Sequence, residues 1–336
     1  MSTIKAFRLN QRGKENPAAR GTPVAATARW IGEMMLKEAN KVYLPDHPYG
    51  VLSAHYHPGI QVAKAAELSF ATDLTFEQII DFLAMGIAGG VSPSGGGADK
   101  TWAFSHDVDD DPAPDTFTVE LGNDDGTTPY GREVEYVFCK RFGIAASIDE
   151  VMKFTADLVG RQVTDGAVTT PIGVPAAWEP ALANKLIVSV NDSWATLGNT
   201  PLTAKVIDMS LDVTTGLREG KYLSGNLYFD NYQFGPLAVD LTMTLEFDAT
   251  ADAEQELVRD RSLRFVRLDV LGSALGGSNN EIKIDLACIH AEDSIQELFS
   301  DRDGNDTVRL HLLGCYDPTG AHDIEFTVVN SLAAIP

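Results

Sequence analysis

The stretch Ala65–Gly90, AAELSFATDLTFEQIIDFLAMGIAGG, determines how the rest of the chain is interpreted. Apolar and polar residues alternate from Ala66 to Phe70, which is the period of a half-buried strand. Thr75 stands three residues before Gln78, an arrangement typical of a helix start. We therefore predict a strand and then a short helix that ends at glycines. One apolar stripe would pack this helix against a sheet. Its members are Phe76, Ile79, Ile80 and Leu83.

The same order of elements returns later in the chain. LTMTLEFDATADAEQELVRDR, residues 241–261, has the pattern of a strand, a polar turn and a short helix. Four further segments match in order: 264–272 with 116–122, 281–293 with 134–146, 307–314 with 153–160, and 324–332 with 186–194. Residues 205–217 and 221–229 are expected to form a further strand pair, the counterpart of the strands before Phe70. Alternating strands also resemble one another by chance, so an internal duplication is one interpretation of the pattern.

The predicted fold is mainly β with a few short helices. It consists of two tandem β-sandwich or barrel-forming domains, each with one flanking helix. We expect an N-terminal arm over residues 1–45, a first domain over 46–183 and a second over 184–336. Strands could be exchanged between the two halves.

Acidic residues dominate the composition. The 336 residues include 48 Asp plus Glu and 26 Lys plus Arg, for a net charge of −22. This balance argues against a nucleic-acid-binding surface, which needs clustered cations. It suits either a soluble protein in general or a surface that lies near DNA without binding it. Three cysteines without a C-x-x-C pair indicate buried free thiols. No signal-like or membrane-spanning run is visible, so we expect a soluble protein made in a cytoplasm.

The first twenty residues reverse this charge balance. Their cations face only Glu15, and they are Lys5, Arg8, Arg12, Lys14 and Arg20. One interpretation is an arm that docks on an acidic neighbouring subunit. The other is a frayed terminus.

Motifs for chemistry are weak. His55 and His57 share a strand face, and the run from Asp107 to Asp115 is rich in carboxylates, but neither provides a full ligand set. The chain has no G-x-S-x-G elbow and no phosphate-binding loop. We expect no catalytic residue, cofactor or metal.

Several phrases together resemble the major tail tube proteins of long-tailed bacteriophages. They are GTPVAATARWIG, AELSFATDLTFEQIIDFLAMGIAGGVSPSG with KTWAFS, DTFTVELG, DLVGRQVT, and NKLIVSVNDSWATLG leading to MSLDVTTGL. The resemblance covers about residues 20–270. It implies a structural virion protein whose rings stack into a hollow tail tube for passage of double-stranded DNA. With an internal duplication it implies trimeric, pseudo-sixfold rings in place of hexamers.

The resemblance also implies partner proteins, a site of assembly and candidate contact residues. Besides copies of itself, the chain would meet a tape-measure protein and tail terminator or tip proteins. It would be assembled in the host cytoplasm. Candidate ring-to-ring contacts are the loop with Asp107, Asp109, Asp110 and Asp111, and the loop Gly89–Ala98. Candidate hairpins on an acidic lumen carry Asp149, Glu150, Asp212 and Glu219.

Two other classes stay open at this point. A virion-borne β-sandwich module for a receptor or carbohydrate would need a cluster of exposed aromatic residues. The four Trp residues, Trp30, Trp102, Trp178 and Trp194, are scattered in sequence. A hydrolase would need Asp107 and Asp109 to act with a metal.

Overall fold

The longest strand, β9 (Tyr130–Ser147), connects the main parts of the molecule. Its first half pairs with β8 (Phe117–Asn123) and β11 (Val163–Gly166). Its second half pairs with β10 (Lys153–Gly160) on one side and β13 (Val206–Thr214) on the other. The computed structural model describes residues 8–44, 59–123, 130–166, 168–170, 172–175, 177–202, 206–248, 254, 257–294, 300–302 and 305–336.

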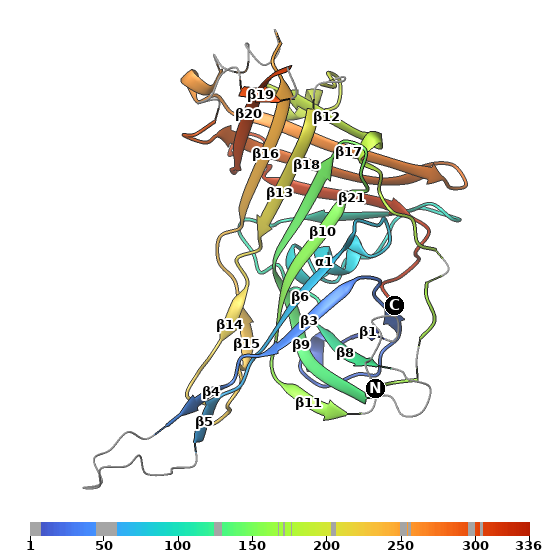
Figure 1. The fold of residues 1–336 in the computed structure, drawn as a ribbon, viewed down its shortest axis with the longest axis vertical. Helices are drawn as coiled ribbons and strands as arrows, with labels where there is room; N and C mark the ends of the chain where they lie inside the picture. Colours follow the sequence, from blue (N-terminus) through green and yellow to red (C-terminus); the bar gives the residue numbers. More distant parts are fainter. Residues whose placement is uncertain are drawn as a thin grey trace, which may run out of the picture.

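A long antiparallel sheet contains the second half of β9 and continues on both sides of it (Figure 1). Its order is β3 (Glu33–Glu38), β6 (Ala66–Asp73), β10, β9, β13, β16 (Ala238–Glu246) and β20 (Asn305–Gly314), followed by the end of β18 (Asn279–His290). The short strand β19 (Ser300–Arg302) also pairs with β20. This sheet is open, because the pairings lead from β3 at one end to β18 and β19 at the other.

Two further strand groups cross this sheet. One has the order β7 (Lys100–Ser105), β21 (Ile324–Asn330), β18, β17 (Arg264–Ala274) and β12 (Leu186–Asn191). The other has the order β2 (Ala28–Arg29), β1 (Arg8–Lys14), β8, the first half of β9 and β11. Figure 1 shows the first group across the upper end of the long sheet and the second below it.

Two hairpins project from the body at the ends of two long-sheet strands (Figure 1). The chain after β3 forms β4 (Lys41–Tyr43) and β5 (Ile60–Ala63). The chain after β13 forms β14 (Arg218–Gly220) and β15 (Asn231–Gln233). Short 3₁₀ turns connect other strands: η2 (Pro17–Ala19), η3 (Ala183–Lys185) and η4 (Trp194–Thr196).

Helix α1 (Ile79–Gly86) lies inside the fold, and all eight of its residues are buried. The stripe Phe76, Ile79, Ile80 and Leu83 is fully within the main core. On the opposite side, the Trp30 ring stacks on Phe82 with ring centroids 5.1 Å apart. The expected flanking helix with one packed face is therefore enclosed on every side. Residues 254 and 257–260 are helical as well, at the place where the second helix was predicted.

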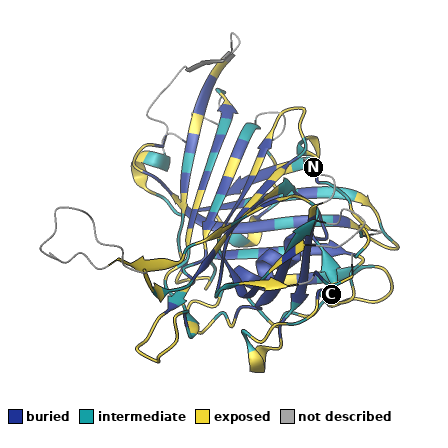
Figure 2. Cartoon of the chain, turned by 60° about the horizontal axis from the view of Figure 1, so that its bottom comes forward, coloured by how far each residue is buried: buried dark blue, intermediate teal, exposed yellow. Residues whose placement is uncertain are grey.

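One continuous core extends through both halves of the chain, from Trp30 to Val328. Strands of the long sheet alternate buried and exposed positions, which Figure 2 shows as dark blue and yellow bands along each strand. This alternation leaves one face of the long sheet open. None of the helices among the described residues is long and apolar enough to cross a membrane.

The mainly β architecture and the hairpin that carries Asp149 and Glu150 confirm the sequence prediction. The hairpin of β9 and β10 turns at Ile148–Glu150, where Asp149 adopts a positive φ of 62°. The expected strand at residues 221–229 is wrong, because this segment forms turns. Ser224 and Asn226 donate hydrogen bonds to the Asp230 carboxylate and close a turn there.

Candidate assembly surface

The open face of the long sheet is the most extended candidate surface of the fold. The pairing register connects one row of residues across eight strands: Glu33, Ala71, Thr155, Gly143, Asp212, Asp240, Leu313 and Ile289. Neighbouring rows add Ser69, Asp157, Ser210 and Thr242. Small, hydroxylic and acidic side chains thus occupy the middle of the face.

Three cations on this face are held by carboxylates of the adjacent strand, whereas Arg309 of β20, opposite Thr244 on the same face, is exposed. Lys37 Nζ lies 2.7 Å from Glu67, Lys153 Nζ lies 2.7 Å from Asp73, and Arg141 Nη2 lies 2.8 Å from Asp212. Each pair is solvent-exposed, so its contribution to stability is small. The effect of this pairing on the electrostatic potential of the face is larger, because a cation paired with a carboxylate attracts a polyanion only weakly.

His311 completes this pattern on β20. Its Nε2 lies 3.0 Å from Asp240 and its Nδ1 lies 2.5 Å from Asp293. Partial burial lowers the pKa of His311, but the hydrogen bonds to these two carboxylates outweigh it and raise the pKa above its ordinary value.

Exposed apolar side chains on this face lie at its two outer edges. Met35 on β3 is 70 % exposed at one edge. Ile289 and Leu313 face each other at the other edge and are 39 % and 38 % exposed. Between them, the outward positions described on β6, β10, the second half of β9, β13 and β16 carry no exposed large apolar side chain. Scattered apolar side chains of this kind are normal on a protein surface, so they identify no contact by themselves.

The N-terminal segment is a strand of the fold and not a free arm over its described part. Arg12 is buried and donates from Nε and Nη2 to Asp81 of α1 at 2.8 and 2.5 Å. Trp30 Nε1 donates to the same carboxylate oxygen at 2.7 Å. Burial raises the pKa of Asp81, and Arg12 and Trp30 oppose that shift. This network ties β1 to the central helix.

The other predicted arm residues have separate places. Lys14 Nζ lies 2.7 Å from Asp115, and Arg20 donates to the Pro114 carbonyl at 3.1 Å. Arg8 is exposed at the start of β1, and Lys5 lies outside the described residues. An inter-subunit role stays a prediction, and Arg8 is the described residue best placed for it.

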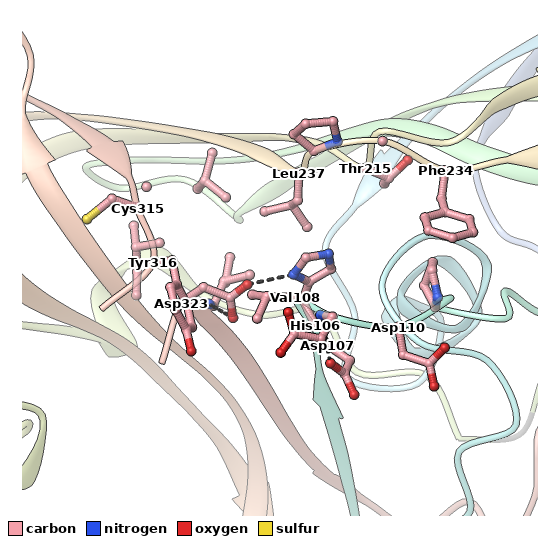
Figure 3. A pocket seen from close by; sticks show the side chains of 18 residues that line it. His106, Asp107, Val108, Asp110, Thr215, Phe234, Leu237, Cys315, Tyr316 and Asp323 are labelled. Atoms are coloured by element: carbon pink, nitrogen blue, oxygen red, sulfur yellow. Dashed lines mark hydrogen bonds and ion pairs between the residues drawn. The ribbon is translucent and has the colours of Figure 1, made fainter. Parts of the chain in front are cut away.

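The acidic loop borders a cavity of about 470 Å³ between β7, β16 and β20 (Figure 3). Asp107, Asp109 and Asp110 line it, and His106 at its wall lies 2.6 Å from Asp323. Asp111 points elsewhere and accepts a hydrogen bond from Tyr232 at 2.7 Å. Burial and this hydrogen bond raise the pKa of Tyr232 to about 12.

The candidate lumen residues do not gather in one place. Asp212 lies on the open face, whereas Asp149 and Glu150 are in the turn at the end of β9. Glu219 is on β14, with its carboxylate 3.5 Å from Lys140 Nζ. Sequence reasoning missed the acidic residues of the central row, such as Asp240, because only the strand order brings them beside Asp212.

The described residues give little support to a metal site or to an aromatic binding platform. Among the described residues, no group of three or more His, Cys, Asp or Glu is arranged to hold a metal. His55 and His57 lie outside the described residues. Trp30 and Trp102 are buried, and Trp194 stacks on His322 with centroids 4.1 Å apart, so these rings do not form an exposed binding platform.

The sequence profile of a family described as phage tail tube protein matches residues 54–285. The chain belongs to the phage tail tube protein family. Membership implies a structural protein of the virion tail that assembles with copies of itself into a tube. A search of curated proteins gave no match.

Proposed function

We propose that the chain is a tail tube subunit of the duplicated kind, in which three copies form a pseudo-sixfold ring and rings stack into a conduit for double-stranded DNA. The observation that carries this proposal is a pattern of strand pairing that occurs twice. In the first half β1 pairs with β8, β3 with β6, β6 with β10, and β9 with β8, β10 and β11. In the second half β12 pairs with β17, β13 with β16, β16 with β20, and β18 with β17, β20 and β21.

Further features recur at equivalent places. Each half inserts a hairpin after its first long-sheet strand, namely β4–β5 after β3 and β14–β15 after β13. Each half has helical residues between its second and its next long strand. Cys139 and Cys288 are both buried, in the matching strands β9 and β18. These matches support domains over about residues 1–183 and 184–336, with β7 given by the first half to the second.

A ring follows if copies repeat the contact that already joins the two halves. The halves meet where β9 pairs with β13, so four strands of each half form one sheet. A head-to-tail contact with a closing rotation produces a ring, and contacts along the axis then produce a tube. Closure would also remove the open edges of the sheet.

The open face is then the proposed lumen. Lys37, Arg141 and Lys153 on this face are paired with carboxylates, Arg309 is its exposed cation, and its middle is rich in carboxylates and hydroxyl groups. Duplex DNA carries about one negative charge per 1.7 Å, so this face would repel it weakly and allow sliding. A tape-measure protein and terminal tail proteins remain expected partners by family.

Electron microscopy and native mass spectrometry of concentrated protein test the assembly. We expect tubes of uniform diameter and rings with the mass of three 36.3-kDa chains. A protein that stays monomeric at every concentration and salt would refute the proposal, and rings of six chains would refute the duplicated form.

The lumen assignment has its own test. Thr155→Lys places a new cation on the open face, and Ala195→Lys places one on the exposed η4 turn as a matched control. Tubes of the first variant should retain short duplex DNA, and tubes of the control should not. Equal retention by both variants would contradict the assignment of this face to the lumen.

A further inference from the structure

We propose that the segment following β3 in one copy covers an exposed apolar pair on β18 and β20 of the next copy, with Val42 packed on Ile289 and Leu313. This inference rests on the proposed function, because it assumes that copies associate as the two halves of the chain do. It adds the side chains that one copy buries on the next.

The template is an apolar cluster where the two halves meet. Val159 of β10 lies two residues after Asp157, so its side chain is on the open face of the long sheet. It pairs with Phe138 of β9, and both side chains are buried. Leu217, just before β14, and Phe229, just before β15, complete this cluster and are buried as well. The second half thus covers one end of the open face of the first half.

The second half carries the corresponding apolar pair. Residues 153–160 of β10 match residues 307–314 of β20, and both segments have a leucine two residues before a closing glycine. Val159 therefore corresponds to Leu313. Leu313 pairs with Ile289 of β18 as Val159 pairs with Phe138. The difference is exposure, because Leu313 and Ile289 are 38 % and 39 % exposed in the single chain.

The same match can be followed to the strands beside β10 and β20. Asp157 and His311 are each three residues before the closing glycine, so they correspond. Asp157 pairs with Ser69 of β6, and His311 pairs with Thr242 of β16. Ser69 and Thr242 therefore correspond too.

One more step identifies the side chain that would cover the exposed pair. Ser69 pairs with Met35 of β3, and the corresponding residue of β16 pairs with Ser210 of β13. Seven residues after these two positions, the chain reaches Val42 and Leu217. Val42 is thus the counterpart of Leu217. Leu217 is 3 % exposed, whereas Val42 is 52 % exposed.

Val42 needs a second copy to make this contact. Strands β3 and β18 lie at opposite ends of the long sheet, so Val42 is far from Ile289 of its own chain (Figure 1). The ribbon of β4 and β5 also exposes Tyr43, Leu44 and Ile60, each by half or more. Two paired strands alone are only marginally stable in water, so a surface that covers their apolar side chains would stabilise the ribbon.

The contact between copies differs from its template at one position. In the template, the Arg161 guanidinium lies 4.6 Å from the centroid of the Tyr136 ring and donates hydrogen bonds to the Phe229 and Asp230 carbonyls. The residue that follows the closing glycine of β20 is Cys315, which cannot make these contacts. The contact between copies therefore depends on apolar burial, and it should be weaker than the contact inside the chain.

Cross-linking of the full chain tests the contact. In a Cys315→Ser background, Val42→Cys protein and Leu313→Cys protein are mixed, assembled and treated with a short bismaleimide. We expect a covalent dimer from the mixture and much less of it from either variant alone. Thr155→Cys is the matched control for Leu313→Cys, because it places a thiol in the middle of the same face, and it should link little to Val42→Cys.

The template supplies a positive control. Leu217→Cys with Val159→Cys in one chain should form an internal link, detected by mass spectrometry of peptides. This link reports whether the reagent spans the geometry of the cluster.

A second measurement uses no cysteine. Leu313→Glu should weaken self-association about tenfold or more in sedimentation, because its carboxylate would be buried against Val42. Thr155→Glu adds the same charge to the exposed middle of the face and should change association much less. Val42→Glu combined with Leu313→Glu should cost less than the sum of the two single changes, since the two residues share one contact.

The outcomes separate this inference from the function. If tubes form and the internal pair links while Val42→Cys with Leu313→Cys does not, the contact is refuted and the function stands. If neither pair links, the glutamate variants decide, and equal effects of Leu313→Glu and Thr155→Glu refute the contact. If the parent protein does not associate at all, the proposed function itself fails.

Discussion

The Arg12–Asp81 pair provides the sharpest test of how the N-terminal strand is held. We expect Asp81→Asn to lower the free energy of unfolding by about 3–5 kcal/mol at neutral pH, the cost of leaving one charge of a buried pair without its partner. The side chains of Arg12 and Asp81 are 5 % and 1 % exposed, so water cannot replace the lost contact. Asparagine keeps an acceptor for Trp30, which isolates the effect of charge.

A double-mutant cycle checks the cause. Replacing a whole buried ion pair by neutral residues is often tolerated, so Arg12→Met with Asp81→Asn should cost at least about 2 kcal/mol less than the sum of the single changes. Urea unfolding followed by far-ultraviolet circular dichroism, at concentrations where the chain is monomeric, measures this. Glu67→Gln in the exposed Lys37–Glu67 pair is the control and should cost about 0–1 kcal/mol. Asp81→Asn within about 1 kcal/mol of the parent, or strict additivity, would refute the reasoning.

Three further predictions concern buried polar groups. Desolvation, with the nearby Glu281 carboxylate, raises the pKa of Asp269 to about 6, so the stability that protonated Asp269 contributes is present at low pH and is lost as pH rises through this value. The free energy of unfolding of Asp269→Asn should therefore rise by about 1 kcal/mol relative to the parent between pH 4 and pH 7, after allowance for partial exposure. A difference between the two proteins that stays constant over this pH range in urea unfolding would contradict the prediction. Asn330→Ala should destabilise the protein by about 2–3 kcal/mol in urea unfolding, because Trp102 Nε1 and the Phe76 carbonyl lose their buried partner. Asn330→Asp keeps the oxygen that accepts from Trp102, and it should cost less if this hydrogen bond contributes most of the stability. Native protein should react with a thiol reagent first at Cys315, because it is half-buried whereas Cys139 and Cys288 are buried; burial raises the pKa of all three thiols, so exposure decides the order. Cys315→Ser should remove the fast phase.

Local patterns were sufficient to predict several elements of the first half, although not the strands within residues 8–43. The alternating residues Ala66–Phe70 lie in β6, as predicted. The predicted helix cap is formed in part, because Thr75 Oγ1 accepts a hydrogen bond from Gln78 N at 3.2 Å. The helix nevertheless begins only at Ile79. The Gln78 side chain accepts a hydrogen bond from Ile31 instead of closing a capping box. A distant strand thus competed with the local cap.

Contacts between distant residues explain what the sequence did not reveal. Asp81 lies off the apolar stripe of its helix, so its pattern predicts exposure. Its partner Arg12 is 69 residues away in the sequence, so no local sequence pattern predicts the pair. Similarly, residues 324–332 were matched with 186–194 by their alternation, yet pairing makes β21 equivalent to β11 and β12 equivalent to β1. Period-2 alternation specifies a strand and its faces but not its neighbour.

The net charge and the exposed apolar side chains at the sheet edges together predict how self-association depends on salt. Two copies with a charge of −22 each repel one another, and salt shortens the range of that repulsion to about 8 Å at physiological ionic strength. A contact between copies that buries the exposed apolar side chains Met35, Ile289 and Leu313 would not weaken in salt. Self-association should therefore strengthen as sodium chloride rises from low concentration to about 0.5 M, as sedimentation would measure.

Docking of a basic arm on an acidic neighbour would have the opposite dependence, since attraction between opposite charges is screened. The structure already pairs Arg12 and Lys14 with carboxylates of their own chain and Arg20 with the Pro114 carbonyl, which leaves Arg8 as the described cation available to such an arm. Arg8→Ala should then change association little at any salt. Association that weakens steadily with salt, and that Arg8→Ala also weakens, would favour the arm over the sheet edges as the main contact between copies.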